Sequence, residues 1–258
     1  MGRVKISKRL TAVAGMVTKG NSVADIGCDH AYTSIYLVQN DISNRVIAMD
    51  VNKGPLERVA EHVKEYNCED FIDIRLSDGA KNLNKGEVDT LMIAGMGGRL
   101  MYKILSDSEE VVRECKELVL QPQSEIFLVR RYLRELGFRI ILEDMLIDED
   151  KYYVIIKAVN EYDRYTCIVD DKQEVYDRYT CIADDNQEVY DLYGEHLLKN
   201  KNEILFEFLQ KEMETCSDIL NNLEKKIDGS GDAIVQRVEE LKVKSEYIRK
   251  GLEFYEVQ

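Results

Sequence analysis

The chain has 258 residues, 45 % of them hydrophobic, so it can bury a core and carry a second, smaller module. Its formal net charge is −14, so the net charge by itself would repel a polyanionic partner. No stretch approaches the roughly 20 apolar residues of a membrane span, and the six cysteines form no C-x-x-C pair. We therefore expect a cytoplasmic protein with reduced cysteines, no metal site and no membrane contact.

The charge is unevenly distributed along the chain. The first 157 residues hold 22 Lys and Arg against 25 Asp and Glu, whereas the remaining 101 hold 13 against 24. Basic residues gather in two clusters, Arg3, Lys5, Lys8, Arg9 and Lys19 near the start, and Arg130, Arg131, Arg134 and Arg139 later. Each cluster is either a phosphate-facing patch, with Lys8, Arg9, Arg130 and Arg131 as RNA-binding residues, or a solvated helix face.

The first predicted element is an amphipathic helix around Leu10–Val17, too short and too interrupted for a signal peptide. A β-prone run follows over residues 22–26 and ends in a glycine turn at Gly27. A second run, Ile47–Met49, stops at Asp50. This βαβ unit is typical of nucleoside-cofactor sites, because Gly27 allows a tight turn and Asp50 can accept two hydrogen bonds from a ribose.

The turn itself, Gly27–Ala31, distinguishes between cofactors. A nicotinamide dinucleotide favours G-x-G-x-x-G, because its pyrophosphate needs close approach to the backbone. Here Asp29 would repel a pyrophosphate but suits a cationic amino-acid end, as in S-adenosylmethionine. The turn therefore favours a methyltransferase over an NAD(P)-dependent oxidoreductase.

Further apolar runs continue the alternation of strands and helices. Strands are predicted at Val23–Gly27, Val46–Asp50, Ile72–Leu76, Thr90–Ala94 and Leu118–Gln121, followed by a helix over Glu125–Leu136. Two long runs then follow, Phe138–Ile147 and Tyr152–Val159, and the four residues between them require an antiparallel hairpin. We therefore predict an α/β fold, a Rossmann-like parallel sheet that ends in an antiparallel hairpin, as class I methyltransferases have.

The last hundred residues contain a repeat and a heptad pattern. Residues 162–175 are repeated almost identically at 176–189, which indicates a local duplication in a linker. Apolar residues then step by three and four from Phe206 to Ile227 and again from Ile234 to Tyr255. This predicts an α-helical coiled-coil hairpin whose apolar seam is its own core. Its other faces, with Lys199, Lys201, Lys225, Lys226, Lys242 and Lys244, could touch RNA.

Several motifs resemble one family, the bacterial tRNA (adenine-22-N1)-methyltransferases of the TrmK type. The matching segments are residues 7–10 (Ser-Lys-Arg-Leu), 25–32 (Asp-Ile-Gly-Cys-Asp-His-Ala-Tyr), 54–56 (Gly-Pro-Leu), 77–79 (Ser-Asp-Gly), 93–98 (Ile-Ala-Gly-Met-Gly-Gly) and 120–123 (Leu-Gln-Pro-Gln). The chain departs from the family at Thr33-Ser34, where many members have Leu-Pro, and we expect this to affect only the helix start. The resemblance implies a methyltransferase domain over 1–159, a duplicated insert over 160–193 and a helical hairpin over 194–258.

The resemblance also implies S-adenosylmethionine as cofactor and tRNA as partner. Cofactor-binding residues would be Asp25, Gly27, Cys28, Asp29, His30, Asp50, Val51, Asp78, Gly79, Ala94, Gly95 and Met96. Gly97-Gly98 could instead be a loop that needs positive φ. The alternatives that stay open are an NAD(P)-dependent oxidoreductase, or a non-enzymatic scaffold that uses the helical hairpin. A monomer is favoured.

Methyl transfer to adenine N1 needs no general base, because that nitrogen has a free lone pair at neutral pH. Catalysis then depends on positioning and on stabilising the charge that moves onto the base. We expect Asp29 in the electrostatic role, and Gln121 or Gln123 at the Watson–Crick edge. Tyr32 or Tyr102 could receive an extruded base, whereas His30 is equally consistent with a structural role.

Overall fold

A computed structural model describes residues 2–160, 186–224 and 232–256. Most of the duplication at residues 162–189 therefore lies outside the described residues. By its internal contacts the chain divides into two compact units, Met1–Cys181 and Ile182–Gln258.

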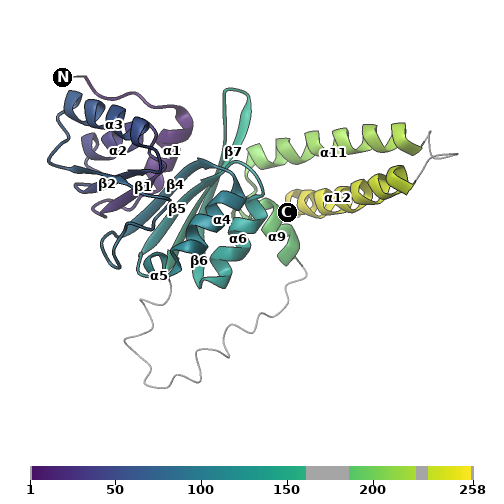
Figure 1. The fold of residues 1–258 in the computed structure, drawn as a ribbon. Coiled ribbons are helices and arrows are strands. Elements are labelled where there is room, and N and C mark those ends of the chain that lie inside the picture. Colours follow the sequence, from purple (N-terminus) through teal and green to yellow (C-terminus); the bar gives the residue numbers. More distant parts are fainter. Residues whose placement is uncertain (1, 161–185, 225–231, 257–258) are drawn as a thin grey trace, which may run out of the picture. The chain divides into compact units, whose positions relative to one another are not determined.

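The first unit is built on a seven-stranded sheet (Figure 1). Its strands are β1 (Val23–Ile26), β2 (Val46–Asp50), β3 (Ile72–Leu76), β4 (Thr90–Met96), β5 (Glu117–Pro122), β6 (Phe138–Asp148) and β7 (Lys151–Asn160). Their order is β3-β2-β1-β4-β5-β7-β6; the first five are parallel, and β7 is antiparallel to β5 and β6. The predicted Rossmann-like sheet with a terminal antiparallel hairpin is confirmed.

The β6–β7 hairpin turns at Glu149 and Asp150, which have φ of 47° and 58°. Two successive left-handed residues are the mark of the tight turn that matches the twist of paired strands. Because β7 runs antiparallel to β5, this turn lies toward the edge where the parallel strands have their carboxyl ends. The hairpin therefore brings Asp148 to the same edge as the predicted motifs.

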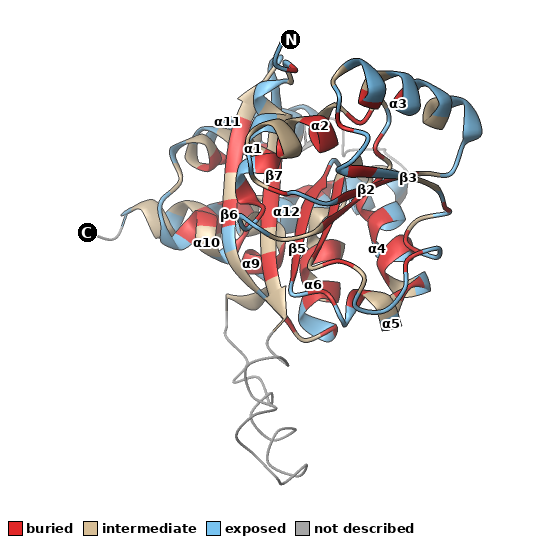
Figure 2. Cartoon of the chain, turned by 90° about the vertical axis from the view of Figure 1, so that its left-hand side faces the viewer, coloured by how far each residue is buried: buried red, intermediate tan, exposed pale blue. Residues whose placement is uncertain are grey.

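Helices cover both faces of the sheet. They are α1 (Lys8–Met16), α2 (Tyr32–Gln39), α3 (Lys53–Glu65), α4 (Gly98–Asp107), the short α5 (Glu109–Val112) and α6 (Ile126–Glu135). Val46 and Ala48 of β2 pack into the core beneath α1, α2 and α3. Ile47 and Met49 alternate with them and are equally buried, so they face the other side of the sheet. That side carries α4 and α6 (Figures 1 and 2). Burial on both faces explains why β2 is a continuous apolar run up to Asp50.

The second unit is helical, with α9 (Gln187–Tyr193), α10 (Glu195–Lys199), α11 (Glu203–Glu224) and α12 (Asp232–Glu256). α11 packs against α12 along the predicted seam, where Leu209, Cys216, Val238, Leu241 and Ile248 are buried. Residues 187–193, which we expected to belong to the insert, form helix α9 and pack against α10 and α12. Among the helices of the described ranges, none is long and apolar enough to cross a membrane.

Candidate active site

The motifs singled out in the sequence come together at one edge of the sheet. Gly27 follows β1, Asp50 ends β2, Asp78 follows β3, Gly95 lies near the end of β4 and Gln121 near the end of β5. In open α/β sheets, ligands bind outside the carboxyl ends of the strands where the strand order reverses. Here the order reverses between β1 and β4, so the candidate site lies above these two strands.

The turn after β1 is tightly wound. Gly27 has φ of 73°, and its N–H and that of Cys28 both donate to the carbonyl of Met49, at 2.8 and 3.0 Å. A β-carbon on Gly27 would lie closer than 3.0 Å to Cε of Met96. The left-handed φ therefore favours glycine, whereas the methyl at the end of the flexible Met96 side chain can move aside.

Asp25 supports this turn from within the sheet. It is only 4 % exposed, and the hydroxyl of Ser34 in α2 donates to its Oδ2 at 2.6 Å. Burial raises the pKa of Asp25 to about 6, although the hydrogen bond from Ser34 lowers it. Ser34, one of the two residues that depart from the family pattern, therefore affects the buried carboxylate of Asp25 and not only the start of the helix.

His30, Tyr32 and His62 form a cluster of three rings beside the turn. The ring centroids of His30 and Tyr32 lie 5.6 Å apart, and those of Tyr32 and His62 lie 4.8 Å apart, both stacked. Nδ1 of His62 lies 3.1 Å from the carbonyl of His30, so it donates there, and Nε2 accepts from the Tyr32 hydroxyl at 3.3 Å. Nδ1 of His30 is buried without a hydrogen-bond partner in the described parts of the chain.

Asp29 and Asp50 are the carboxylates that border this space. Asp29 has φ of 49° and a side chain that is 74 % exposed, with Oδ1 3.6 Å from Nε2 of His30. Oδ1 of Asp50 accepts the N–H of Asn52 at 2.8 Å, which orients the carboxylate. The neighbouring Val51 is an apolar side chain that is 58 % exposed.

Asp78 and Gly79 follow β3 at the outer side of the site. Nζ of Lys81 lies 2.5 Å from Oδ2 of Asp78, and this contact lowers the pKa of Asp78. Gly79 has φ of 62°, and a β-carbon there would meet the side chain of Ile104 at 3.0 Å. Asp78 therefore stays ionised and can accept a hydrogen bond from a ligand.

β4 ends in a bulge, and this bulge positions the residues that form the floor of the site. Its pairing with β5 shifts register between Ala94 and Met96, and Gly95 between them has φ of 80°. A β-carbon on Gly95 would lie 3.5 Å from Nη1 of Arg9 and 3.7 Å from Nε2 of Gln123. The bulge therefore brings a guanidinium and an exposed amide to the floor predicted from the sequence.

Gln121 does not face this space, which corrects the expectation that its amide reads the base. The residue is fully buried. Its Oε1 accepts from Nη1 of Arg9 at 2.6 Å, and its Nε2 donates to the carbonyl of Pro122 at 3.2 Å. Both ends of the amide are thus engaged, and Gln123 is the exposed amide of the pair.

The prediction that Arg130 binds RNA is wrong. Arg130 is 3 % exposed, and its Nε donates to the fully buried carboxylate of Glu143 at 2.8 Å. To meet a phosphate, the Arg130 guanidinium would have to leave this buried carboxylate, which is costly. Arg131 is partly exposed over the ring of Phe127, and Lys8 is exposed, so both can still contact RNA.

The residues at this edge fit S-adenosylmethionine. The turn after β1 carries no side chain at Gly27, and Asp50 can accept a hydrogen bond from a ribose through its second oxygen. The buried Nδ1 of His30 needs a partner, and exposed Val51 offers an apolar surface for an adenine ring. The sequence alone did not indicate His62, Asp148 or Tyr153 at the site, because their partners, His30 for the first and Arg9 for the other two, are far away in the chain.

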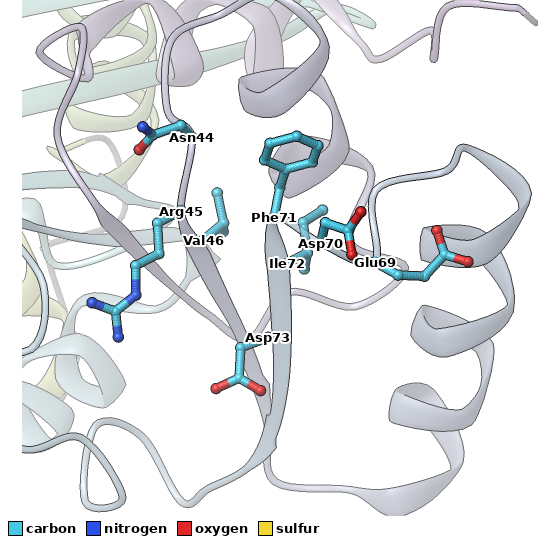
Figure 3. A pocket seen from close by; sticks show the side chains of 8 residues that line it. All are labelled: Asn44, Arg45, Val46, Glu69, Asp70, Phe71, Ile72 and Asp73. Carbon is cyan, nitrogen blue, oxygen red and sulfur yellow. The ribbon is translucent and has the colours of Figure 1, made fainter.

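A shallow hollow at the opposite edge has a different character (Figure 3). It is lined by Asn44, Arg45, Val46, Glu69, Asp70, Phe71, Ile72 and Asp73, at the amino ends of β2 and β3. It contains no glycine turn, so it lacks the features of a nucleoside site. Among the described residues, no group of three or more His, Cys, Asp or Glu is placed to hold a metal ion.

Comparisons with known proteins agree with this geometry. A family model described as a methyltransferase domain matches residues 6–156. The chain is 28 % identical over 253 residues to the tRNA (adenine(22)-N(1))-methyltransferase of Bacillus subtilis, covering 98 % of this chain and 99 % of that one.

Solved structures give the same result. The crystal structure of the B. subtilis M1A22 tRNA methyltransferase TrmK matches with a TM-score of 0.78 and 28 % identity, over 96 % of this chain and 99 % of that one. Streptococcus pneumoniae Sp1610, solved in complex with S-adenosyl-L-methionine, matches with a TM-score of 0.76 and 26 % identity, over 96 % and 100 %. These matches confirm the resemblance that the motifs indicated. Because the family model spans more than half of the sequence, this chain belongs to the methyltransferase domain family.

Proposed function

We propose that this protein transfers a methyl group from S-adenosylmethionine to N1 of adenine 22 in tRNA. The observation that carries the proposal is its likeness, over nearly the full length of both chains, to the B. subtilis enzyme of that name. The acidic, glycine-hinged turn after β1 supports it and does not favour a nicotinamide dinucleotide, whose pyrophosphate Asp29 would repel.

The cofactor supplies an electrophilic methyl group on a positively charged sulfur. In our proposal the methionine end of the cofactor is surrounded by the turn residues Gly27, Cys28, Asp29 and His30. The Asp50 carboxylate accepts hydrogen bonds from the ribose hydroxyls. The remaining residues line the space or support it, namely Asp25, Val51, Asp78, Gly79, Ala94, Gly95 and Met96. The exposed Val51 would cover one face of the adenine ring, which removes apolar surface from water.

The target base needs orientation rather than a proton acceptor, because adenine N1 already has a free lone pair. Gln123, exposed beside the Gly95 bulge, is our candidate for the Watson–Crick edge. Asp29 is our candidate for stabilising the positive charge that develops on the base. Its side chain is 74 % exposed, so its field is strong only once bound RNA has displaced water from the site.

An extruded adenine needs an aromatic surface, and the two candidates are Tyr32 and Tyr102. Tyr32 is half-buried and held at the rim by the His30 and His62 rings. Tyr102 is 43 % exposed, but its ring packs edge-on against Tyr132 at 4.6 Å. We favour Tyr32, because its cluster borders the turn that surrounds the cofactor.

We propose that the tRNA backbone is contacted by Lys8, Arg9 and Arg131. The lysines of the helical unit are less suited, because Lys199 pairs with Glu195 and Lys244 pairs with Glu212. Two further candidates, Lys225 and Lys226, lie outside the described residues. A tRNA substrate goes with a cytoplasmic location, and we propose that the protein acts as a monomer.

The proposal is tested with unmodified bacterial tRNA and labelled S-adenosylmethionine, followed by nucleoside analysis. We expect 1-methyladenosine in the wild-type tRNA and none in a tRNA whose adenine 22 is replaced by guanine. S-adenosylhomocysteine binding, measured by calorimetry in the same sample, establishes that the protein is folded. A sample that binds this product but leaves tRNA unlabelled would overturn the proposed function.

A further inference from the structure

Arg9 is held in the site by residues that are distant in the sequence. Its Nη1 donates to the buried Oε1 of Gln121 at 2.6 Å, and its guanidinium carbon lies 5.3 Å from the ring centroid of Tyr153. The same Nη1 lies 3.5 Å from the place that a β-carbon on Gly95 would occupy. The guanidinium is therefore fixed against the floor of the site, unlike a mobile surface arginine.

The helix that carries Arg9 is anchored at both ends. At its start, the N–H of Arg9 donates to Oδ2 of Asp148 at 3.0 Å, and Ser7 accepts the N–H of Leu10 at 3.2 Å. Beyond its other end, the N–H and hydroxyl of Thr18 donate to the buried carboxylate of Glu117, at 2.8 and 2.5 Å. Such anchoring keeps the guanidinium in one place, as a binding site requires.

Most of the hydrogen-bonding capacity of Arg9 is unused. A guanidinium has five N–H donors, and within the described parts of the chain Arg9 engages one of them, with Gln121. The side chain is half-buried and opens toward the Gly95 bulge. Its remaining donors form the planar fork that matches a phosphate or a carboxylate.

The proposed reaction decides which part of the substrate Arg9 can contact. A donor directed at adenine N1 would occupy the lone pair that must attack the methyl group. A cation against the ring would also oppose the positive charge that the product base carries. The phosphate beside the target nucleotide has neither conflict. We infer that Arg9 binds a backbone phosphate of the target nucleotide and that Gln121 is its positioning residue, an inference that rests on the proposed function.

The test compares Arg9→Ala, Arg9→Lys and Gln121→Ala in the full-length protein, with Lys85→Ala as matched control. Lys85 is also cationic, but it pairs with Glu110 in the loop before β4, at the opposite edge. For Arg9→Ala we expect the KM for tRNA to rise about 10- to 100-fold, as for the loss of charge-assisted hydrogen bonds, with a much smaller change in kcat. The slope of the logarithm of the tRNA binding constant against the logarithm of salt concentration should fall in magnitude by about one, as for the loss of one phosphate contact.

Arg9→Lys keeps the charge but not the fork, so we expect a KM between those of the wild type and Arg9→Ala. Gln121→Ala should raise KM about tenfold alone and add nothing to Arg9→Ala, because it acts through Arg9. If Gln121→Ala fails to fold, Gln121→Glu serves instead: it neutralises the guanidinium and should mimic Arg9→Ala. S-adenosylhomocysteine affinity should stay unchanged in every variant.

Failure of this inference is distinguishable from failure of the proposed function. If the wild type methylates adenine 22 and Arg9→Ala behaves like Lys85→Ala, the phosphate contact is absent and the inference is overturned. If effects of Arg9→Ala and Gln121→Ala multiply in the double variant, Gln121 does not act through Arg9. If the wild type leaves tRNA unmodified, the proposed function itself has failed.

Discussion

The backbone N–H of Gly98 donates to the carbonyl of Ser124 at 2.9 Å, which joins the start of α4 to the loop after β5. A β-carbon on Gly98 would lie 2.5 Å from the carbonyl oxygen of Glu125 and closer still to that of Ser124. Gly97 has φ of −65°, and Gly98 is not among the glycines with positive φ. Gly98 is therefore required for the close packing of two backbones, and not for a positive φ.

Gly98→Ala should therefore destabilise the protein by about 2 kcal/mol, because backbone atoms must move to admit a methyl group. Gly97→Ala is the matched control: its β-carbon would meet only the Ser124 hydroxyl, at 3.1 Å, and a side chain can rotate away. Urea denaturation of both variants measures the difference. Equal stability of the two variants would contradict the close packing.

Asp50→Ala should weaken S-adenosylhomocysteine binding by about 1 to 3 kcal/mol, roughly 5- to 150-fold, through loss of hydrogen bonds to the ribose. Its carboxylate is oriented by Asn52 and leaves one oxygen for the ligand. Asp70→Ala removes the same charge from the opposite edge and should leave affinity unchanged. Calorimetry on both variants gives the comparison, and equal affinities would exclude Asp50 from the ribose site.

The sheet was predictable because its signals are local. The apolar run of β2 is buried on both faces, and β2 has the bounds expected from the sequence. β3 also has the expected bounds, although its apolar residues alternate with Asp73 and Arg75. The four-residue link after Ile147 likewise required a hairpin. Glycine turns and strand-end carboxylates lie at fixed places relative to these runs, which is why Gly27, Asp50 and Gly95 were placed at one edge.

Side-chain pairing was not predictable, because it depends on residues that only folding brings together. Arg9 meets Gln121 across 112 positions of sequence, and this contact changes Gln121 from a base reader into a support. Arg130 belonged to a basic cluster, yet Glu143 on β6 neutralises it in the interior. A charge pattern shows which residues are cationic, but not which of them remain in contact with solvent.

Arg130→Met tests this second correction. Arg130→Met takes from the buried Glu143 carboxylate the guanidinium that pairs with it, so we expect a loss of about 3 to 5 kcal/mol in the free energy of unfolding. The KM for tRNA, measured at a temperature where the variant is folded, should be that of the wild type. Arg131→Ala, a partly exposed neighbour, should show the reverse pattern, with little change in stability and weaker tRNA binding. A weakened tRNA contact in folded Arg130→Met would restore Arg130 as an RNA-binding residue.

Asp25 makes the stability of the protein depend on pH in a predictable direction. Its pKa is about 6 in the folded chain against an ordinary 3.8. Below the lower value both states are protonated and no penalty exists. As the pH rises from 3.8 through 6, Asp25 ionises first in the unfolded chain, and in the folded chain it can ionise only as a buried carboxylate. The free energy of unfolding therefore falls over this range. The difference corresponds to about 3 kcal/mol.

Asp25→Asn should remove this dependence, because an amide can still accept the hydrogen bond from Ser34 and does not ionise. The variant should therefore gain stability relative to the wild type between pH 4 and pH 7, as the wild type loses it. Comparing the two proteins at each pH cancels carboxylates such as Glu87, whose lowered pKa acts in the opposite direction. Ser34→Ala should shift the loss to higher pH, because Ser34 lowers the Asp25 pKa. Urea denaturation across this range measures all three proteins, and parallel curves for the wild type and Asp25→Asn would show that Asp25 is ionised throughout.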